Sequence, residues 1–320
     1  MRIVVALGGN ALLKRGEPMS AVLQRRNVGA AADALVALIA AGHQIVVTHG
    51  NGPQVGLIAL QSAAGPKDGS YPLDILGAES QGMIGYLIEQ ALRDRLPSGA
   101  LLATLLTQVR VDVSDPAFQH PTKPIGPVYD AAEAAGLASA RGWSVAPDGD
   151  HWRRVVPSPE PQEILGLGAI QLLVQAGVLV ISTGGGGIPV VAREDVGFEG
   201  VEAVIDKDRA SSLLAGEIGA DMLLMLTDVD AVYVDFGKPV ARAIARAGAD
   251  SLRSEDFAAG SMGPKVAAAK RFAALTGKVA AIGRIEDASA IVRQAAGTWI
   301  TAGDGPVVFT HEAAARTEPV

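Results

Sequence analysis

Short apolar runs alternate with longer amphipathic segments through the first third of the chain. Residues 3–7 and 45–48 are rich in valine and isoleucine, as buried strands are. Residues 24–41 and 78–96 place apolar side chains three and four positions apart, which predicts helices with one buried face. Pro53 is expected in the first turn of another helix, where a missing N–H is tolerated. The chain therefore begins as alternating strands and helices.

A further apolar run at residues 101–106 is expected to be a buried strand. It completes a β-α-β-α-α-β order, which is typical of a largely parallel sheet with helices on both faces. Similar segments return after residue 161, and those of the second half of the chain predict a second α/β lobe. The strands expected after residue 161 are 178–181, 221–226, 232–234, 278–282 and 298–300. The expected helices end at 218, run to 275 and begin at 286.

The alternation stops between residues 112 and 161, where proline is frequent. The centre of this insert holds Lys123 between prolines, which favours a stiff, extended backbone. Residues 130–141 have helical periodicity, and residues 152–156 are suited to one strand of a hairpin. We interpret the insert as a small protruding lid subdomain within an N-terminal lobe (1–200). The alternative is a long surface loop, although loops of this length in compact domains are usually functional or disordered.

Three of the expected strands end in glycine turns. The ends of parallel strands share one edge of a sheet, and ligands of open α/β sheets bind at that edge. Backbone N–H groups in such turns can cradle an anion. Ordinary tight turns are the alternative, which three occurrences after buried strands make less attractive. The turns are Gly8-Gly9-Asn10, Gly50-Asn51-Gly52 and Gly184–Gly187.

Composition narrows the classes of partner. The 320 residues include 27 Lys plus Arg and 34 Asp plus Glu, so the net charge is −7 and nucleic acid is not expected as a partner. Cysteine is absent, which excludes disulfides and thiolate sites and fits a cytoplasmic location. No run reaches the length of a membrane span, and the first apolar run lacks a signal-peptide cleavage pattern.

Several familiar sites do not match the spacing. No glycine turn is followed by the Lys-Ser/Thr pair of a Walker loop, and Pro189 occupies the third position of a Rossmann pattern. Asp235-Phe236-Gly237 has no companion His-Arg-Asp loop of protein kinases. A nucleophile elbow is also missing. The histidines lack metal-ligand spacing; they are His43, His49, His120, His151 and His311.

Backbone cradles and loop lysines remain, and they suit phosphoryl transfer. That reaction needs positioning and cationic stabilisation of phosphoryl oxygens more than covalent chemistry. Lys207 lies between two aspartates that could hold its ammonium group, and Lys265 begins a helix after a glycine-rich turn. Lys123 is the third candidate, from the insert. For any single lysine, the alternative is a solvated surface charge.

Ten ordered segments resemble the carbamate kinase branch of the amino acid kinase family. They extend from the first strand to about residue 265, and the tail matches more loosely. The segments are 5–12, 48–56, 80–86, 115–118, 121–127, 152–159, 182–189, 201–209, 227–233 and 260–265.

The resemblance implies one domain over 1–320 with a three-layer αβα sandwich, an open sheet and a nucleotide-binding C-terminal lobe (201–320). It also implies a homodimer and Mg²⁺-dependent phosphoryl exchange between ATP and carbamate. The expected net direction is carbamoyl phosphate plus ADP to ATP, carbon dioxide and ammonia, in arginine or related nitrogen catabolism. Magnesium would be held mainly by the nucleotide phosphates and water, without a dedicated protein site.

By position, the resemblance also assigns roles to residues. The implied catalytic residues are Lys123, Lys207, Asp208 and Lys265; the carbamate and phosphoryl contacts are Gly8, Gly9, Asn10, Gly50, Asn51 and Gly52; the nucleotide contacts are Asp228, Tyr233, Met262 and Lys265. Many members of the wider family have a lysine where this chain has Ala6. Lys123 is expected to supply the missing charge.

Two other functions stay open. One is a related kinase that acts on another acid, such as acetylglutamate, or on UMP; Ala6 and the proline-rich insert argue against it. The other is a non-catalytic sensor of a nucleotide or small acid, which the three lysines do not favour. The chain departs from the family pattern at residues 149–151 and from Gly303 onward. These departures leave the chemistry alone but bear on lid motion and dimer contacts.

Overall fold

A computed structural model describes the chain except for residues 14–16, 19, 66–70, 196, 259 and 311–320. Its largest sheet has the order β13-β14-β16-β15-β12-β1-β2-β9-β3, and β17 pairs with β14. All pairs from β15 to β3 along this order are parallel. The strands are β1 (Arg2–Leu7), β2 (Gln44–His49), β3 (Leu102–Thr104), β9 (Leu179–Ile181), β12 (Met222–Thr227), β13 (Val232–Val234), β14 (Arg242–Gly248), β15 (Val279–Arg284), β16 (Thr298–Thr301) and β17 (Val308–Phe309).

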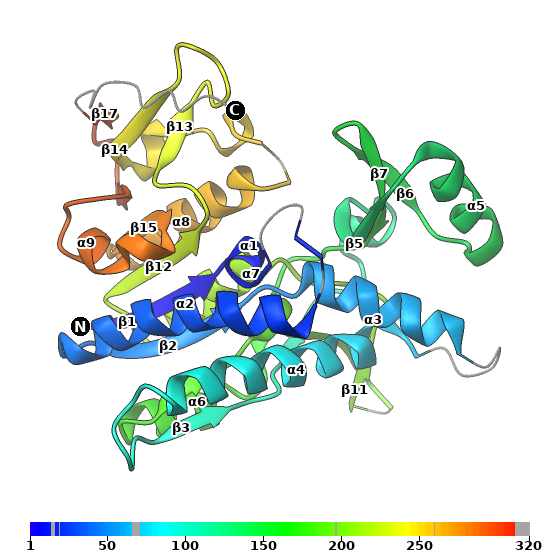
Figure 1. Cartoon of the computed structure of the whole chain (residues 1–320), viewed down its shortest axis with the longest axis horizontal. Coiled ribbons are helices and arrows are strands. Elements are labelled where there is room, and N and C mark those ends of the chain that lie inside the picture. The colour runs from blue at the N-terminus through cyan, green and yellow to red at the C-terminus, as the bar shows by residue number, and fades with distance from the viewer. Residues whose placement is uncertain (14–16, 19, 66–70, 196, 259, 311–320) are drawn as a thin grey trace.

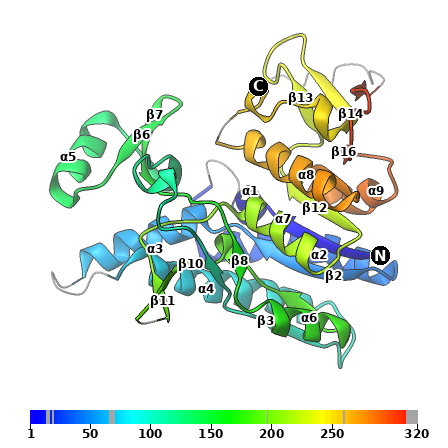
Figure 2. The same ribbon diagram turned by 180° about the vertical axis from the view of Figure 1, so that it is seen from behind.

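Strand β1 shows how the sheet is covered on both sides. Ile3 and Val5 belong to one apolar core, with helices α2, α4 and α9, whereas Val4 and Ala6 belong to a second core, with α6, α7 and α8. The two helix layers can be followed in Figures 1 and 2. This confirms the expected three-layer αβα sandwich with a largely parallel sheet. The helices are α1 (Gly9–Leu12), α2 (Ala21–Ala40), α3 (Gly52–Ala64), α4 (Leu73–Arg93), α5 (Ala131–Arg141), α6 (Leu167–Gln175), α7 (Lys207–Glu217), α8 (Met262–Thr276) and α9 (Ala288–Val292).

Local signals set the helix ends. The Ser20 hydroxyl accepts a 3.3 Å hydrogen bond from the N–H of Leu23 and caps α2, and Gly42 follows that helix with a φ of +81°. The predicted helices 24–41 and 78–96 are thus confirmed, with shifts of a few residues. No helix in the described part of the chain combines the length and hydropathy that a membrane span requires.

A strand is present within residues 101–106, but the prediction that it is buried is wrong. Strand β3 covers three of these residues, and the side chains of Leu101 and Leu106 are each 61% exposed. The reason is its place in the sheet: β3 lies at the end of the strand order and pairs with β9 alone among the described strands. Burial of an apolar run depends on a second neighbour that the local sequence does not reveal.

A second, four-stranded sheet has the order β11-β10-β4-β8 and was not predicted. Its strands are short and carry charged residues, so they have little periodicity to detect. It lies next to the main sheet, since β10 directly follows the glycine turn after β9. The strands are β4 (Gln108–Arg110), β8 (Glu163–Ile164), β10 (Ile188–Arg193) and β11 (Gly197–Gly200).

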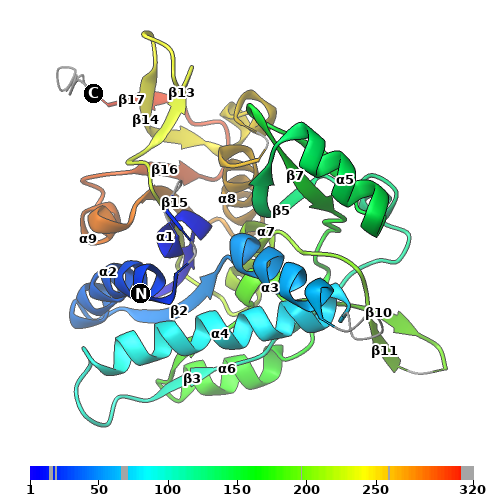
Figure 3. The ribbon, with the colours of Figure 1, turned by 45° about the vertical axis from the view of Figure 1, so that its right-hand side comes forward.

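Part of the insert projects from the main body (Figure 1) and lies beside helix α3 (Figure 3). Three antiparallel strands, in the order β5-β7-β6, carry helix α5; the strands are β5 (Lys123–Tyr129), β6 (Val145–Asp148) and β7 (His151–Val156). The predicted helix and hairpin strand are both present. The unit contacts α3 where Gly56 meets Gly126: a Cβ on Gly56 would lie 2.0 Å from the Gly126 Cα. We refer to residues 112–161 as the lid, although its movement stays a prediction.

Candidate active site

The first two glycine turns meet at the carboxyl edge of the sheet. A Cβ on Gly50 would lie 3.3 Å from the Gly9 nitrogen and 3.5 Å from the Lys207 Cδ. The N–H of Gly8 donates to Leu226 at 2.8 Å, and the N–H of Gly50 donates to Leu7 at 3.1 Å. These two amides therefore fasten the turns to neighbouring strands. The absence of a Cβ lets the turns and the lysine approach one another closely.

Helix α3 begins in the second turn and directs its first N–H groups toward this edge. Asn51 precedes it, and the Asn51 side-chain amide donates to the Ser80 hydroxyl at 2.8 Å. Asn10 lies in α1, and its side chain is outside the described part of the structure. The structure therefore brings three of the predicted substrate-binding glycines together. Gly50 lies against Gly9 and Lys207, and Gly52 is the first residue of α3.

The third turn, Gly184–Gly187, has a different place from the one its sequence suggested. All four residues are buried, and a Cβ on Gly185 would lie 2.1 Å from the Asn51 side-chain nitrogen. A Cβ on Gly184 would lie 2.3 Å from Nε2 of His49. In this structure the third turn packs against His49 and Asn51 of the second turn, so its backbone is covered and does not form an open anion-binding site.

Lys207 and Lys265 converge on one carboxylate. The Lys207 ammonium pairs with Oδ1 of Asp208, and the Lys265 ammonium lies 3.2 Å from Oδ2 of the same residue. The three side chains are 9%, 13% and 4% exposed, in the order Lys207, Lys265 and Asp208. Residues 57 positions apart in the sequence therefore form one buried ion-pair cluster.

Asp206 lies beside this cluster and does two things. Its Oδ1 accepts hydrogen bonds from the N–H groups of Asp208 at 2.9 Å and Arg209 at 3.3 Å, which caps helix α7. Its Oδ2 pairs with the ammonium group of Lys123 on the lid. The prediction placed Lys123 among the site lysines, and the structure brings it there through a residue that the sequence reading did not assign.

The charges shift each other's pKa. Burial alone would raise the pKa of both aspartates, but the neighbouring ammonium groups lower it below the usual range: Lys123 first for Asp206, and Lys207 first for Asp208. Burial lowers the pKa of Lys207, and Asp208 opposes that effect. For Lys265, burial is outweighed by the two aspartates, so its pKa is raised. Both carboxylates are ionised at neutral pH.

His49 is a buried residue of the site that the sequence reading missed. It is 1% exposed, and its Nδ1 lies 3.1 Å from the Gly50 carbonyl oxygen, to which it donates as the neutral tautomer. Burial lowers the pKa of His49 to about 4, the Gly50 carbonyl opposes this shift, and the charge of Lys207 adds to it. His49 is therefore neutral at pH 7. His311 lies outside the described residues.

The residues predicted to contact the nucleotide lie less close together than the lysines and aspartates do. The charge of Asp228 contributes to the raised pKa of Lys265, which puts it on the same side of the site. Met262 begins α8 and packs against the core beneath that helix. The Tyr233 hydroxyl instead donates to Asp230 at 3.0 Å, and its ring meets Phe236 edge-on at 5.8 Å.

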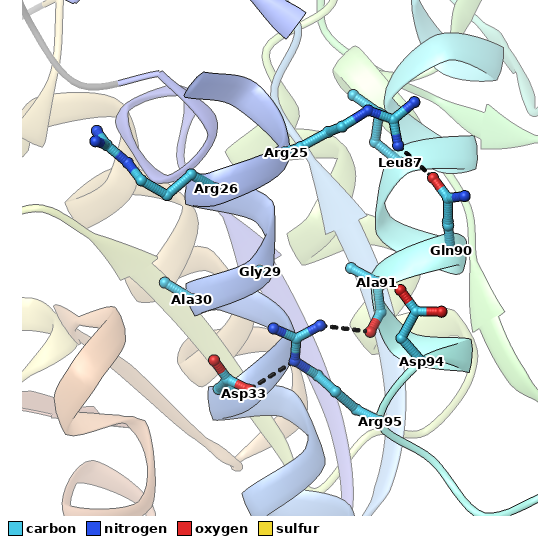
Figure 4. Close-up of a pocket in the computed structure, with 10 residues that line it drawn as sticks. All are labelled: Arg25, Arg26, Gly29, Ala30, Asp33, Leu87, Gln90, Ala91, Asp94 and Arg95. Atoms are coloured by element: carbon cyan, nitrogen blue, oxygen red, sulfur yellow. Dashed lines mark hydrogen bonds and ion pairs between the residues drawn. The ribbon is translucent and has the colours of Figure 1, made fainter. Parts of the chain in front are cut away.

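A cavity of about 560 Å³ lies elsewhere, between α2 and α4 (Figure 4). Arg25, Arg26 and Arg95 line it, and each guanidinium group already has an acceptor: Arg25 bonds Gln90, Arg26 bonds Glu17, and Arg95 bonds Asp33 and the Ala91 carbonyl. None of the predicted site residues lines this cavity. It is therefore distinct from the candidate active site.

Comparison with known proteins now identifies the class. The amino acid kinase family model matches residues 1–282, and the chain belongs to this family. Within it, the chain is similar to curated carbamate kinases: 55% identical over 314 residues to that of Rhizobium meliloti, covering 98% of this chain and 97% of the relative. The carbamate kinase of Haemophilus influenzae is 54% identical over 301 residues, covering 94% and 97%.

Solved structures agree. Carbamate kinase from Giardia lamblia bound to AMP-PNP is 41% identical, with a TM-score of 0.84, and the match covers 94% of this chain and 98% of that one. A UMP kinase from Bacillus anthracis is only 14% identical, with a TM-score of 0.55 and coverage of 97% and 98%. That second likeness concerns the fold alone. The expected family and fold are thus confirmed.

Proposed function

We propose that this chain is a carbamate kinase, a phosphotransferase with a carboxyl-type acceptor that exchanges a phosphoryl group between ATP and carbamate. The observation that carries the proposal is the convergence of Lys123, Lys207 and Lys265 at the glycine-lined sheet edge. Its support from relatives is the high identity to carbamate kinases over nearly the whole chain. We infer that the net direction is carbamoyl phosphate plus ADP to ATP, carbon dioxide and ammonia, in arginine or related nitrogen catabolism.

In the proposed reaction, a terminal ADP oxygen attacks the phosphorus of carbamoyl phosphate, and the bond from phosphorus to the carbamate oxygen breaks. Lys207 and Lys265 neutralise the charge that spreads over the phosphoryl oxygens, and Asp208 holds both ammonium groups in place. Carbamate leaves as an anion, so no general acid is required. Lys123 adds a third positive charge from the lid.

The backbone at the sheet edge would bind carbamate and the transferred phosphoryl group. Gly9, Asn51 and Gly52 offer N–H groups at helix starts, where the helix dipole favours an anion. Gly8 and Gly50 contribute through their missing side chains, since their own N–H groups bond to neighbouring strands. Asn10 completes the set that the sequence predicted.

The C-terminal lobe, 201–320, would bind the nucleotide, with Asp228, Tyr233, Met262 and Lys265 as its contacts. Mg²⁺ would enter with the nucleotide. Among the described residues no three His, Cys, Asp or Glu side chains gather as a metal-binding group. We propose that the nucleotide phosphates and water hold the magnesium ion, and its chemistry would be charge neutralisation on the phosphates.

We also propose a cytoplasmic homodimer, without nucleic-acid or membrane partners. The edge strand β3 offers a surface for a second copy of the chain. The exposed Leu101 and Leu106 flank this strand, and the exposed Tyr86 lines a surface pocket together with Thr104 of β3. Exposed edge strands are natural sites for association. The net charge of −7 supports the exclusion of polynucleotides.

The test is ATP formation from carbamoyl phosphate and Mg-ADP in a coupled assay, with acetyl phosphate as the control substrate. The proposal expects ATP from carbamoyl phosphate well above the acetyl phosphate rate. Lys123→Ala is expected to lower turnover about 100-fold or more, the scale for removing one group that stabilises transition-state charge. Lys238→Ala is the matched control, because that lysine is 66% exposed and pairs with Asp235 on the surface.

Two results would contradict the proposal. If the folded wild-type protein makes no more ATP from carbamoyl phosphate than from acetyl phosphate, the chain acts on another acceptor or is a sensor. A Lys123→Ala variant with a near-normal rate would remove the lid lysine from the mechanism.

A further inference from the structure

The lid lysine does not stand free above the site, because Asp206 holds it. Lys123 begins β5, where the lid first reaches the site edge, and its ammonium group pairs with Oδ2 of Asp206 across 83 residues of sequence. The Asp206 side chain is 8% exposed, and that of Lys123 is 27% exposed. The other oxygen of the same carboxylate caps α7, the helix that carries Lys207 and Asp208.

Because one oxygen of Asp206 caps α7 and the other pairs with Lys123, the direction of the carboxylate is fixed. A cap bonded to two backbone N–H groups cannot turn freely, so Oδ2 points in a set direction. A lysine side chain has four flexible carbon–carbon bonds and needs a fixed partner to stay in one place. Loss of the contact would leave the buried Asp206 carboxylate without the ammonium group that acts on it most strongly, and this opposes separation of the pair.

Each of the three lysines forms its ion pair with one of two aspartates, Asp206 or Asp208. Asp208 holds the two lysines that come from α7 and α8, and Asp206 holds the one that comes from the lid. We propose that Asp206 is a positioning residue, which holds Lys123 at the phosphate site so that the third positive charge is in place before the phosphoryl group transfers. This inference rests on the proposed function and adds a residue to it.

Asp206→Asn is the sharpest variant. Asparagine caps helices as well as aspartate does, so α7 keeps its cap. The charge that pairs with Lys123 is lost, together with the longer-range effect of the Asp206 charge on Lys207 and Lys265. We expect kcat to fall about 10- to 100-fold, the scale for loss of a charged hydrogen bond that positions a reacting group. KM for Mg-ADP is expected to change less than about 3-fold, because the Asp208 pairs remain. Asp206→Ser, which also caps the helix without a charge, replaces this variant if it does not fold.

A double-mutant cycle with Lys123→Ala separates positioning from a general structural effect. If Asp206 acts through Lys123, Asp206→Asn lowers kcat in the wild-type background and changes it little in the Lys123→Ala background. An equal loss in both backgrounds, or an unchanged or raised kcat in Asp206→Asn, overturns the proposal. Asp148→Asn is the matched control: it removes a lid carboxylate whose ion-pair partner is Arg153, 3.2 Å away on the β6–β7 pair, and kcat is expected to stay unchanged.

Limited proteolysis of the lid gives a readout that does not depend on activity. Asp206→Asn and Lys123→Ala are each expected to raise the cleavage rate within residues 112–161 several-fold, and the double variant no further than either single variant. Equal cleavage rates in wild type and all variants overturn the proposal. If the wild type makes no ATP from carbamoyl phosphate but the cleavage rates follow this pattern, the proposed function fails while the contact that holds Lys123 stands.

Discussion

The buried His49 makes the stability of the fold depend on pH. Its ring is packed against the third glycine turn, where a Cβ on Gly184 would lie 2.3 Å from Nε2. Burial lowers its pKa from 6.5 to about 4 in the folded protein, because the charged ring would be held without water and near the Lys207 ammonium group. In the unfolded chain the ring is solvated and titrates near its ordinary value.

The sign follows from proton binding. Above pH 6.5 the ring is neutral in both states, and His49 does not affect the folding equilibrium. Below pH 6.5 the unfolded chain binds the proton first, so stability falls as the pH drops toward 4. With about 1.4 kcal/mol for each pKa unit, the full loss is about 3 kcal/mol. About 2 kcal/mol of it is expected between pH 7.5 and pH 5.

Urea denaturation at pH 7.5, 6.5, 5.5 and 5 tests this in wild type, His49→Asn and His151→Asn, the last being an exposed lid histidine. The comparison uses only the change in unfolding free energy with pH, so a constant loss in a variant does not matter. The asparagine variant at position 49 is expected to lack about 2 kcal/mol of the wild-type decline. The variant at position 151 should retain it. Equal declines in wild type and His49→Asn would refute the burial argument.

Three further predictions concern close contacts and charge. Gly185→Ala puts a side chain at a φ of +64° and a Cβ 2.1 Å from the Asn51 amide, so we expect turnover to fall at least about tenfold in a coupled assay; wild-type kinetics would contradict this. Gly56→Ala drives a Cβ into lid backbone and is expected to lower the unfolding free energy by about 1–3 kcal/mol in urea, whereas Gly77→Ala, with open space around it, should not. Lys265→Met should reduce kcat about 100-fold with the fold intact by circular dichroism, and a loss confined to KM would contradict the assigned role.

The fold was predictable as far as local patterns report it. Alternation of apolar runs and helical periodicity located β1, β2, α2 and α4, because each has its own buried face. Burial of β3 could not be predicted, since it depends on where that strand lies in the sheet order. The four-stranded sheet was missed for a related reason: β8 has two residues, and its stability comes from pairing with β4.

The residue types of the site could be predicted from the sequence, but most of the contacts between them could not. Glycine turns and loop lysines stand out locally, so Lys207 and Lys265 could be named as candidates, and the structure places both against Asp208. Asp206 was visible only as a neighbour of Lys207, because its partner is 83 residues away. His49 could not be assigned, because its low pKa comes from a turn far along the chain that closes over it. Long-range packing, not residue identity, decides these roles.

The ion pairs also explain how the three lysine side chains of the site keep their positions. Three ammonium groups and two carboxylates form ion pairs at this edge, and the carboxylate of Asp228 adds a further negative charge that acts on Lys265. Without the aspartates, three nearby lysines would repel one another and turn toward water. With them, each ammonium group is held at the sheet edge. Under the proposed function, an arriving anion would meet donors that need little rearrangement. A phosphate-bearing ligand would bind these ammonium groups only where the fold brings them together, so binding should stabilise the folded chain as well as fill the site.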